Sequence, residues 1–119
     1  MKFIQEWGTN VKRGKEVAFQ KWLDANEEAL AKAHPKGCVY LGTFATIFSS
    51  EKHAGAFRMF IQLDSYAALD RAAAAAKDPT STYGKLIQEL VAFFDTQNDA
   101  DWSNGLHKAV VDATVWNTK

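Results

Sequence analysis

The sequence predicts an α+β domain in which helices cover one face of a four-stranded antiparallel sheet. Strand-like alternation of apolar residues occurs at 3–7, 38–48, 56–63 and 106–116. Apolar residues at helical spacing fill most of the chain between the first two strands and between the last two. The predicted order is therefore β-α-β-β-α-α-β. A chain of 119 residues suits one hydrophobic core, so we interpret residues 1–119 as a single domain.

The first strand leads directly into the first helix. Gly8-Thr9-Asn10 supplies turn and capping residues, and the helix is expected to begin near Val11. It is expected to end at His34, because the residue before a proline, here Pro35, is disfavoured in helical backbone.

The third strand leads into a helical layer that is interrupted once. The polar stretch 49–55 separates the second and third strands and indicates a hairpin. Five consecutive alanines at 72–76 favour a helix after the third strand. Asp78-Pro79 predicts a cap followed by the first residue of a third helix. The turn-rich segment 97–105 then precedes the last strand. This split βαβ order is the ferredoxin-like arrangement.

Alternation along the strands assigns each side chain to one face of the sheet. The rows expected to face the helices are Phe57, Met59, Ile61 and Leu63, then Val39, Leu41, Ala45 and Ile47, then Val111, Ala113 and Val115. Seven of the fifteen aromatic residues are expected on the opposite face: Phe3, Trp7, Tyr40, Phe44, Phe48, Phe60 and Trp116. A large exposed apolar patch is unusual on a soluble monomer, so we expect a second copy to cover this face. The alternative is that some strands have the opposite parity, since a one-residue bulge reverses the faces.

The composition excludes several classes of partner. Fourteen basic residues balance fourteen acidic ones, so the charge that drives binding to nucleic acid or to anionic membranes is missing. No apolar run reaches the ~20 residues of a membrane span, and the start of the chain has no signal-peptide pattern. We therefore expect a cytoplasmic protein. The single cysteine, Cys38, is expected to be a buried strand residue.

Three local stretches of the chain resemble a known superfamily. They are the lead into the first helix at 11–16 with Phe19 and Trp22 following, the strand-to-helix passage at 60–69, and Lys77-Asp78-Pro79. With the order of elements, they are similar to small monooxygenase-like and NIPSNAP-like members of the dimeric α/β-barrel superfamily. The resemblance implies a homodimer whose two sheets close into one barrel. It implies no single activity, because members include cofactor-free oxygenases, haem-degrading enzymes and isomerases.

Polar residues expected on the helix side of the sheet are candidates for a small-molecule site. In relatives of this fold, ligands lie between sheet and helices. Glu6 and Tyr83 are the candidate catalytic residues, with Glu6 as a general base if an apolar setting raises its pKa. Thr43 and Trp22 are the candidate ligand contacts. The alternatives are a solvated glutamate at a strand end and a tryptophan that belongs to the core.

Two charged residues, Arg58 and Asp112, occur in the middle of predicted strands among apolar neighbours. A buried charge is costly unless it is paired. The first strand is expected to lie between the third and the fourth, where Gln5 would bridge the two charges. We therefore predict a polar network of Gln5, Arg58 and Asp112 in the dimer interface; the alternative is a ligand site.

No cofactor is expected. No spacing of histidine, cysteine or carboxylate residues matches a metal site, and no dinucleotide fingerprint occurs. The resemblance also disfavours haem, because the haem-using members of the superfamily place a histidine on a helix beside the pocket. Here His34 ends a helix, His53 lies in a hairpin loop and His107 opens the last strand.

The function expected from the sequence is a small-molecule-binding homodimer. A cofactor-free oxygenase or isomerase acting on a modest aromatic or apolar ligand is the first hypothesis. The alternative is a non-catalytic binding or structural dimer. A cavity of ~300 Å³ or more with Glu6 or Tyr83 in its wall would favour the enzyme.

Overall fold

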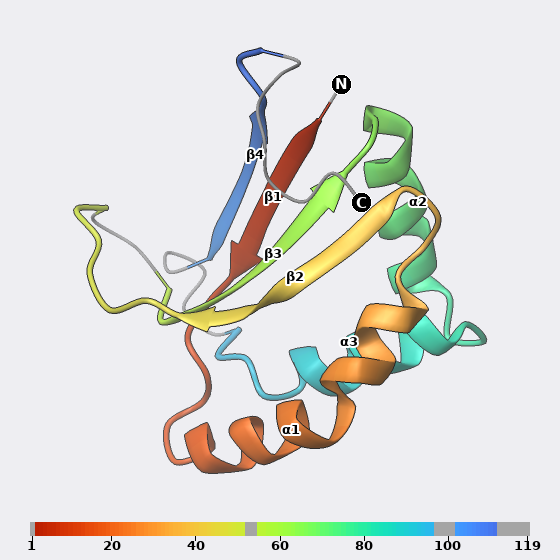
Figure 1. Cartoon of the computed structure of the whole chain (residues 1–119). Coiled ribbons are helices and arrows are strands. Elements are labelled where there is room, and N and C mark those ends of the chain that lie inside the picture. The colour runs from red at the N-terminus through yellow and green to blue at the C-terminus, as the bar shows by residue number, and fades with distance from the viewer. Residues whose placement is uncertain (1, 52–54, 97–101, 112–119) are drawn as a thin grey trace.

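The computed structural model describes residues 2–51, 55–96 and 102–111, which adopt the predicted α+β architecture (Figure 1). The elements are β1 (Phe3–Gly8), α1 (Glu16–Ala33), β2 (Cys38–Ala45), β3 (Phe57–Leu63), α2 (Tyr66–Lys77), α3 (Thr82–Val91) and β4 (Ser103–Lys108). Their order confirms the predicted β-α-β-β-α-α-β arrangement. No helix among the described residues combines the length and apolarity needed to cross a membrane.

The four strands form one antiparallel sheet in the order β2-β3-β1-β4. The first strand therefore lies between the third and the fourth, as predicted. Its register places Phe3 opposite Leu63 and Trp7 opposite Met59. Figure 1 shows α1, α2 and α3 gathered on one side of the sheet. The other side, which we call the open face, is not covered by any described helix.

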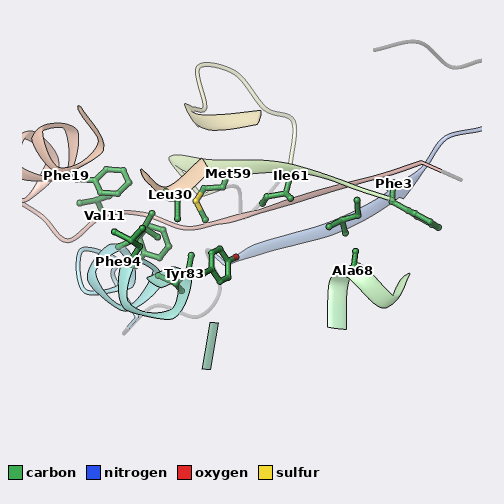
Figure 2. Close-up of a cluster of buried hydrophobic side chains, with 13 residues drawn as sticks. Phe3, Val11, Phe19, Leu30, Met59, Ile61, Ala68, Tyr83 and Phe94 are labelled. Atoms are coloured by element: carbon green, nitrogen blue, oxygen red, sulfur yellow. The ribbon is translucent and has the colours of Figure 1, made fainter. Parts of the chain in front are cut away.

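The hydrophobic core lies between the sheet and the helices (Figure 2). Its most deeply buried apolar side chains, each no more than 1% exposed, are Phe3, Phe19, Leu30, Met59, Leu63, Ala68, Leu90 and Phe94. They come from two strands, all three helices and the segment after α3. Burying a large apolar side chain contributes about 1.5–3 kcal/mol, so this layer holds the helices on the sheet.

The first helix begins later than predicted. Val11 forms a β-bridge with Phe94, and the Lys12 amide donates to the Phe93 carbonyl at 2.8 Å, so the chain is extended where a helix was expected. The helix starts only at Glu16, after Gly14 turns the backbone with a φ of 84°. Its predicted end before the proline is confirmed.

Serine side chains cap the other two helices. Ser65 accepts a hydrogen bond from the Ala68 amide at the start of α2, and Ser81 accepts one from the Gly84 amide at the start of α3. The expected helix start at Asp78-Pro79 is wrong. The Asp78 carboxylate instead accepts hydrogen bonds from the amide and hydroxyl of Thr80 in the turn between the helices.

The last strand lies earlier in the sequence than predicted. Residues 103–108 pair with β1, and Ser103, Asn104 and Gly105 lie opposite Gly8, Trp7 and Glu6. Polar residues can form this strand because the free edge of β1 requires only backbone hydrogen-bond partners, which do not depend on the side chains. The predicted strand 106–116 therefore overlaps it only at its start, and residues 112–116 lie outside the described residues.

The face assignments are correct for β3 and wrong for β1. Met59, Ile61 and Leu63 are buried against the helices, as predicted. Residues directly opposite one another in an antiparallel pair point to the same face. Because Phe3, Gln5 and Trp7 lie opposite Leu63, Ile61 and Met59, they face the helices and not the open face.

A bulge divides β2 into two halves with different parity. Before it, Cys38 and Tyr40 lie opposite Leu63 and Ile61, so Tyr40 faces the helices and its predicted place on the open face is wrong. The register then shifts between Tyr40 and Gly42, and Phe44 lies opposite Arg58. Phe44 is therefore on the open face, as predicted. Leu41 borders the open face too, against expectation, and Val39 is 42% exposed.

Gly84 allows α2 and α3 to meet closely. A Cβ atom at this position would overlap the carbonyl oxygens of Asp78 and Ala75. We predict that Gly84→Ala lowers the free energy of unfolding by about 1–3 kcal/mol, because an added methyl group forces the helix junction apart. Urea unfolding followed by circular dichroism measures this. Gln88→Ala, at an exposed site on the same helix, is the control, and equal stability of the two variants would contradict the prediction.

Candidate functional site

A pocket of about 180 Å³ lies between the sheet and the α2–α3 pair. The residues that line it are Gln5 and Trp7 from β1, Leu69, Ala72, Ala73 and Ala76 from α2, Tyr83 and Ile87 from α3, and Trp102 and Asn104 at β4. The location agrees with the sequence-based expectation of a cavity between sheet and helices. The pocket is smaller than the ~300 Å³ expected for a typical ligand site.

The alanine run of α2 leaves room for the pocket. Ala72, Ala73 and Ala76 present only methyl groups to it. Longer side chains at these positions would extend toward the sheet, as core side chains elsewhere in the layer do. The run therefore has two effects: it favours the helix, and it keeps a space beneath β1 and β4 unfilled.

Two tryptophans from β1 and the start of β4 form an aromatic wall. The ring centroids of Trp7 and Trp102 are 6.3 Å apart, and the ring planes differ by 14°. Phe94 meets both rings edge-on, with centroid separations of 6.1 Å and 5.7 Å. Contacts of this geometry add about 0.5–1.5 kcal/mol beyond burial, so the wall is held in place.

The polar groups of the pocket are all uncharged. The Gln5 Nε2 donates to the Asn104 Oδ1 at 3.2 Å, which links β1 and β4 through their side chains. Tyr83 is 6% exposed, and its hydroxyl has no hydrogen-bond partner among residues 2–51, 55–96 and 102–111. Burial raises the pKa of Tyr83 to about 12, so the hydroxyl keeps its proton at neutral pH.

The far side of the Tyr83 ring contacts a stack of rings at the end of α1. His34 lies edge-on to Tyr83 with a centroid separation of 4.7 Å and is stacked on Tyr40 at 5.3 Å. The Tyr40 hydroxyl donates to Glu27 at 2.9 Å and shares a hydrogen bond with Thr43. Figure 2 shows Tyr83 on the helix side of the sheet, within the core layer.

His34 is held as a neutral imidazole. Its Nδ1 lies 2.7 Å from the Leu30 carbonyl oxygen and donates to it, so in the neutral ring Nε2 carries no proton. Nε2 is buried and has no partner within the described part of the chain. Burial lowers the pKa of His34, and the hydrogen bond to Leu30 offsets this only in part. Sequence reasoning used His34 only as a helix end, although its place four residues after Leu30 on the buried stripe was a usable signal.

The predicted place of Glu6 is wrong. Glu6 lies opposite Phe60 and Gly105 on the open face, and not in the pocket. Its Oε1 is 3.3 Å from the Arg58 Nη1 and 3.9 Å from the His107 Nε2. The parity of β1 that places Phe3 in the core also places Glu6 on the opposite side, so this carboxylate cannot serve as a base for a ligand in the pocket.

Arg58 is the centre of a polar cluster on the open face. It is 8% exposed, and a second carboxylate, Glu51, lies 3.0 Å from its Nη2. The predicted place of Gln5 in this network is wrong, because Gln5 lies on the helix side of the sheet. The predicted partner Asp112 lies outside the described residues. The expectation that the buried charge is paired agrees with these contacts.

Trp22 and Thr43 do not line the pocket, although both were candidate ligand contacts. The Trp22 Nε1 donates to Glu89 at 3.2 Å, which joins α1 to α3, and its ring packs against Phe93. Thr43 is bonded to Tyr40. The position of Trp22, partly buried against the core, matches the alternative of a core tryptophan.

Cys38 and the acidic residues of the described ranges form no metal site. Burial raises the pKa of the Cys38 thiol, whose Sγ lies 3.5 Å from the Ala68 carbonyl oxygen. Within the described ranges, no group of three histidine, cysteine, aspartate or glutamate side chains could hold a metal ion.

The open face also carries an apolar surface. Ile4, Leu41, Phe44 and Phe60 border a shallow hollow whose exposed lining is entirely apolar. Phe44 is 51% exposed, and beyond the end of β2 Ile47 and Phe48 are 94% and 89% exposed. The open face thus combines large exposed apolar side chains with the paired Arg58 cluster.

The fold is similar to those of solved NIPSNAP proteins. A NIPSNAP family protein from Agrobacterium tumefaciens is 14% identical, with a TM-score of 0.63 over 96% of this chain and 97% of that one. An uncharacterised NIPSNAP domain protein from Burkholderia xenovorans is 11% identical, with a TM-score of 0.62 over 97% and 100%. A NIPSNAP-like domain protein from the same organism is 12% identical, with a TM-score of 0.59 over 98% and 96%.

These comparisons confirm the resemblance predicted from the sequence at the level of the fold. No family model matches the chain, and no curated protein sequence matches it either. The role of the pocket must therefore be argued from the geometry of this chain.

The half-buried His34 predicts a loss of stability in acid. Its pKa in the folded state is below the unfolded value of 6.5, so the stability contributed by the neutral ring is complete above pH 6.5 and is lost as the pH falls through the lower folded-state pKa. Urea unfolding above and below pH 6.5 measures this loss. His34→Phe keeps the ring contacts with Tyr40 and Tyr83 and should reduce the pH dependence. An unchanged pH dependence in the variant would refute the assignment to His34.

Proposed function

We propose that this chain is a small-molecule-binding homodimer in which each protomer holds one ligand between its sheet and its α2–α3 pair. The observation that carries the proposal is the unfilled pocket, with the unpartnered Tyr83 hydroxyl in its wall. Protein interiors are usually close-packed, and a ligand that fills the space would restore this packing. It would also accept a hydrogen bond from the Tyr83 hydroxyl, which has no partner among the described residues.

The size and lining of the pocket support a small, largely apolar ligand. A cavity of about 150 Å³ lined by apolar side chains can hold benzene. The pocket here has a volume of about 180 Å³, which corresponds to a single substituted ring. Its lining is dominated by Trp7, Trp102, Ile87 and the α2 alanines.

The geometry supports binding better than oxygenase or isomerase chemistry. Cofactor-free oxygenation and many isomerisations use a group that takes a proton from the substrate. Among the described residues that line the pocket, Tyr83 alone has an ionisable side chain. Its pKa of about 12 keeps it protonated at neutral pH, so it cannot act as the base. The predicted base, Glu6, is on the opposite face of the sheet.

The open face supports pairing with a second copy. A sheet with helices on one side needs a cover for its other side when that side is apolar. The exposed aromatic and aliphatic side chains around Phe44 and Phe60 meet this condition. Arg58 already has its carboxylate partners within the protomer, so a partner sheet could cover the cluster without leaving the charge unpaired. The superfamily resemblance implies the same sheet-to-sheet homodimer.

A charge on the open face should prevent pairing. We predict that the wild-type chain has a solution mass of twice 13.2 kDa, and that Phe44→Glu gives a monomer because it places a carboxylate in the apolar interface. Light scattering coupled to size exclusion measures the mass. Val17→Glu is the matched control, since Val17 is an exposed apolar residue on α1, and this variant should keep the wild-type mass. A Phe44→Glu protein with the mass of a dimer would contradict the proposed interface.

Filling the pocket should abolish binding without unfolding the protein. We predict that toluene shifts the NMR signals of the Trp7 and Trp102 indole groups in the wild type, and that Ala72→Phe removes this response because the new ring occupies the space. Ala74→Phe is the control: Ala74 is exposed on the same helix and does not line the pocket, so this variant should bind as the wild type does. No response of the folded wild type at saturating toluene would count against a ligand site and favour a purely structural dimer.

A further inference from the structure

We infer that the ligand is an uncharged single-ring aromatic compound with a carbonyl oxygen, such as an aryl ketone or aldehyde, and that the Tyr83 hydroxyl donates to this oxygen. The inference rests on the proposed function, since it names the ligand class of the same pocket. It follows from the shape of the pocket, its lack of charge and its hydrogen-bond inventory.

The walls of the pocket favour a flat ring. The nearly parallel rings of Trp7 and Trp102 lie at its β1–β4 side. The α2 side consists of the methyl groups of Ala72, Ala73 and Ala76. Aromatic rings stack or pack edge-on against tryptophan with a gain beyond simple burial, which a branched aliphatic ligand of equal volume would not obtain.

The pocket selects against charged ligands. No charged side chain occurs among the described residues that line it. The charged groups near β1 and β3 are instead on the open face, where Arg58 is already paired with Glu6 and Glu51. Transfer of an ionised carboxylate or ammonium from water into an apolar site without a counter-charge is strongly unfavourable. A neutral molecule is therefore preferred over its acidic or basic analogue.

The hydrogen-bond inventory favours an acceptor on the ligand. Because Tyr83 stays protonated and unpartnered, it offers an O–H donor that nothing in the described chain accepts. The Gln5 amide donates to the Asn104 oxygen, and the Asn104 amide N–H groups remain as further donors beside a single other acceptor oxygen, that of Gln5. A carbonyl oxygen has two lone pairs and no proton, which matches a pocket whose unused groups are mainly donors.

Three compounds of nearly equal shape separate these features. Acetophenone has the ring and the carbonyl oxygen, α-methylstyrene replaces that oxygen with a methylene group, and benzoate carries a negative charge at neutral pH. We expect the wild type to bind acetophenone about 3- to 10-fold more tightly than α-methylstyrene, the factor that corresponds to one net hydrogen bond. Benzoate should bind more weakly than either. NMR titration of the Trp7 and Trp102 indole signals gives the three dissociation constants.

Tyr83→Phe identifies the donor. Removal of a hydroxyl that has no partner among the residues that the structure describes should leave the fold intact. In this variant the dissociation constant for acetophenone should rise to that for α-methylstyrene, whose own value should not change. A preference for acetophenone that persists in Tyr83→Phe would overturn the assignment of Tyr83.

The outcomes for the wild type separate this inference from the proposed function. Equal binding of acetophenone and α-methylstyrene would overturn the carbonyl class while leaving a small-molecule site in place. Tightest binding of benzoate would overturn the neutral class in the same way. Absence of binding by all three compounds would reject the proposed ligand site, and this inference with it.

Discussion

The antiparallel register of the two central strands, β1 and β3, is the constraint on which the rest of the structure depends. With Phe3 opposite Leu63 and Trp7 opposite Met59, the odd-numbered residues of β1 join the core and the pocket. The even-numbered residues must then face away from the helices. A shift of one residue would place Glu6 beneath the helices and Trp7 on the open face. The neutral pocket and the charged open face are thus two results of one pairing.

Most of the fold could be predicted because the strongest patterns agree with it. The row from Phe57 to Leu63 alternates so regularly that its faces were assigned correctly. In β1 both rows mix apolar and polar residues, so alternation alone could not identify the buried one. The bulge near Leu41 reverses the parity within β2 without a sequence signal strong enough to locate it. The edge strand at 103–108 is polar and resembles a turn, because only its backbone is required for pairing with β1.

The candidate site was less predictable than the fold, since it is assembled from several elements. Tyr83 was recognised as a polar residue of a buried helix face, and the structure places it in the pocket wall. Gln5, Trp7 and Asn104 were missed as pocket residues because their positions depend on the parity of β1 and the start of β4. Trp22 and Thr43 were chosen for their chemistry, but they pack beside the pocket against α3 and Tyr40. Residue type indicated which side chains could take part in chemistry. Which of them line the pocket depends on the pairing register of the strands.

The bulge in β2 makes the length of this strand as important as its composition. Tyr40 and Thr43 are three residues apart, yet both face the helices and share a hydrogen bond, because one extra residue lies between them. If the same residues formed a regular strand without the bulge, Phe44 would move from the open face toward the core. We therefore expect insertions and deletions during evolution between Tyr40 and Phe44 only where the bulge is gained or lost with them. They should accumulate instead in the connection that leaves β2 after Ala45, where a change of length does not alter which side chains face the helices.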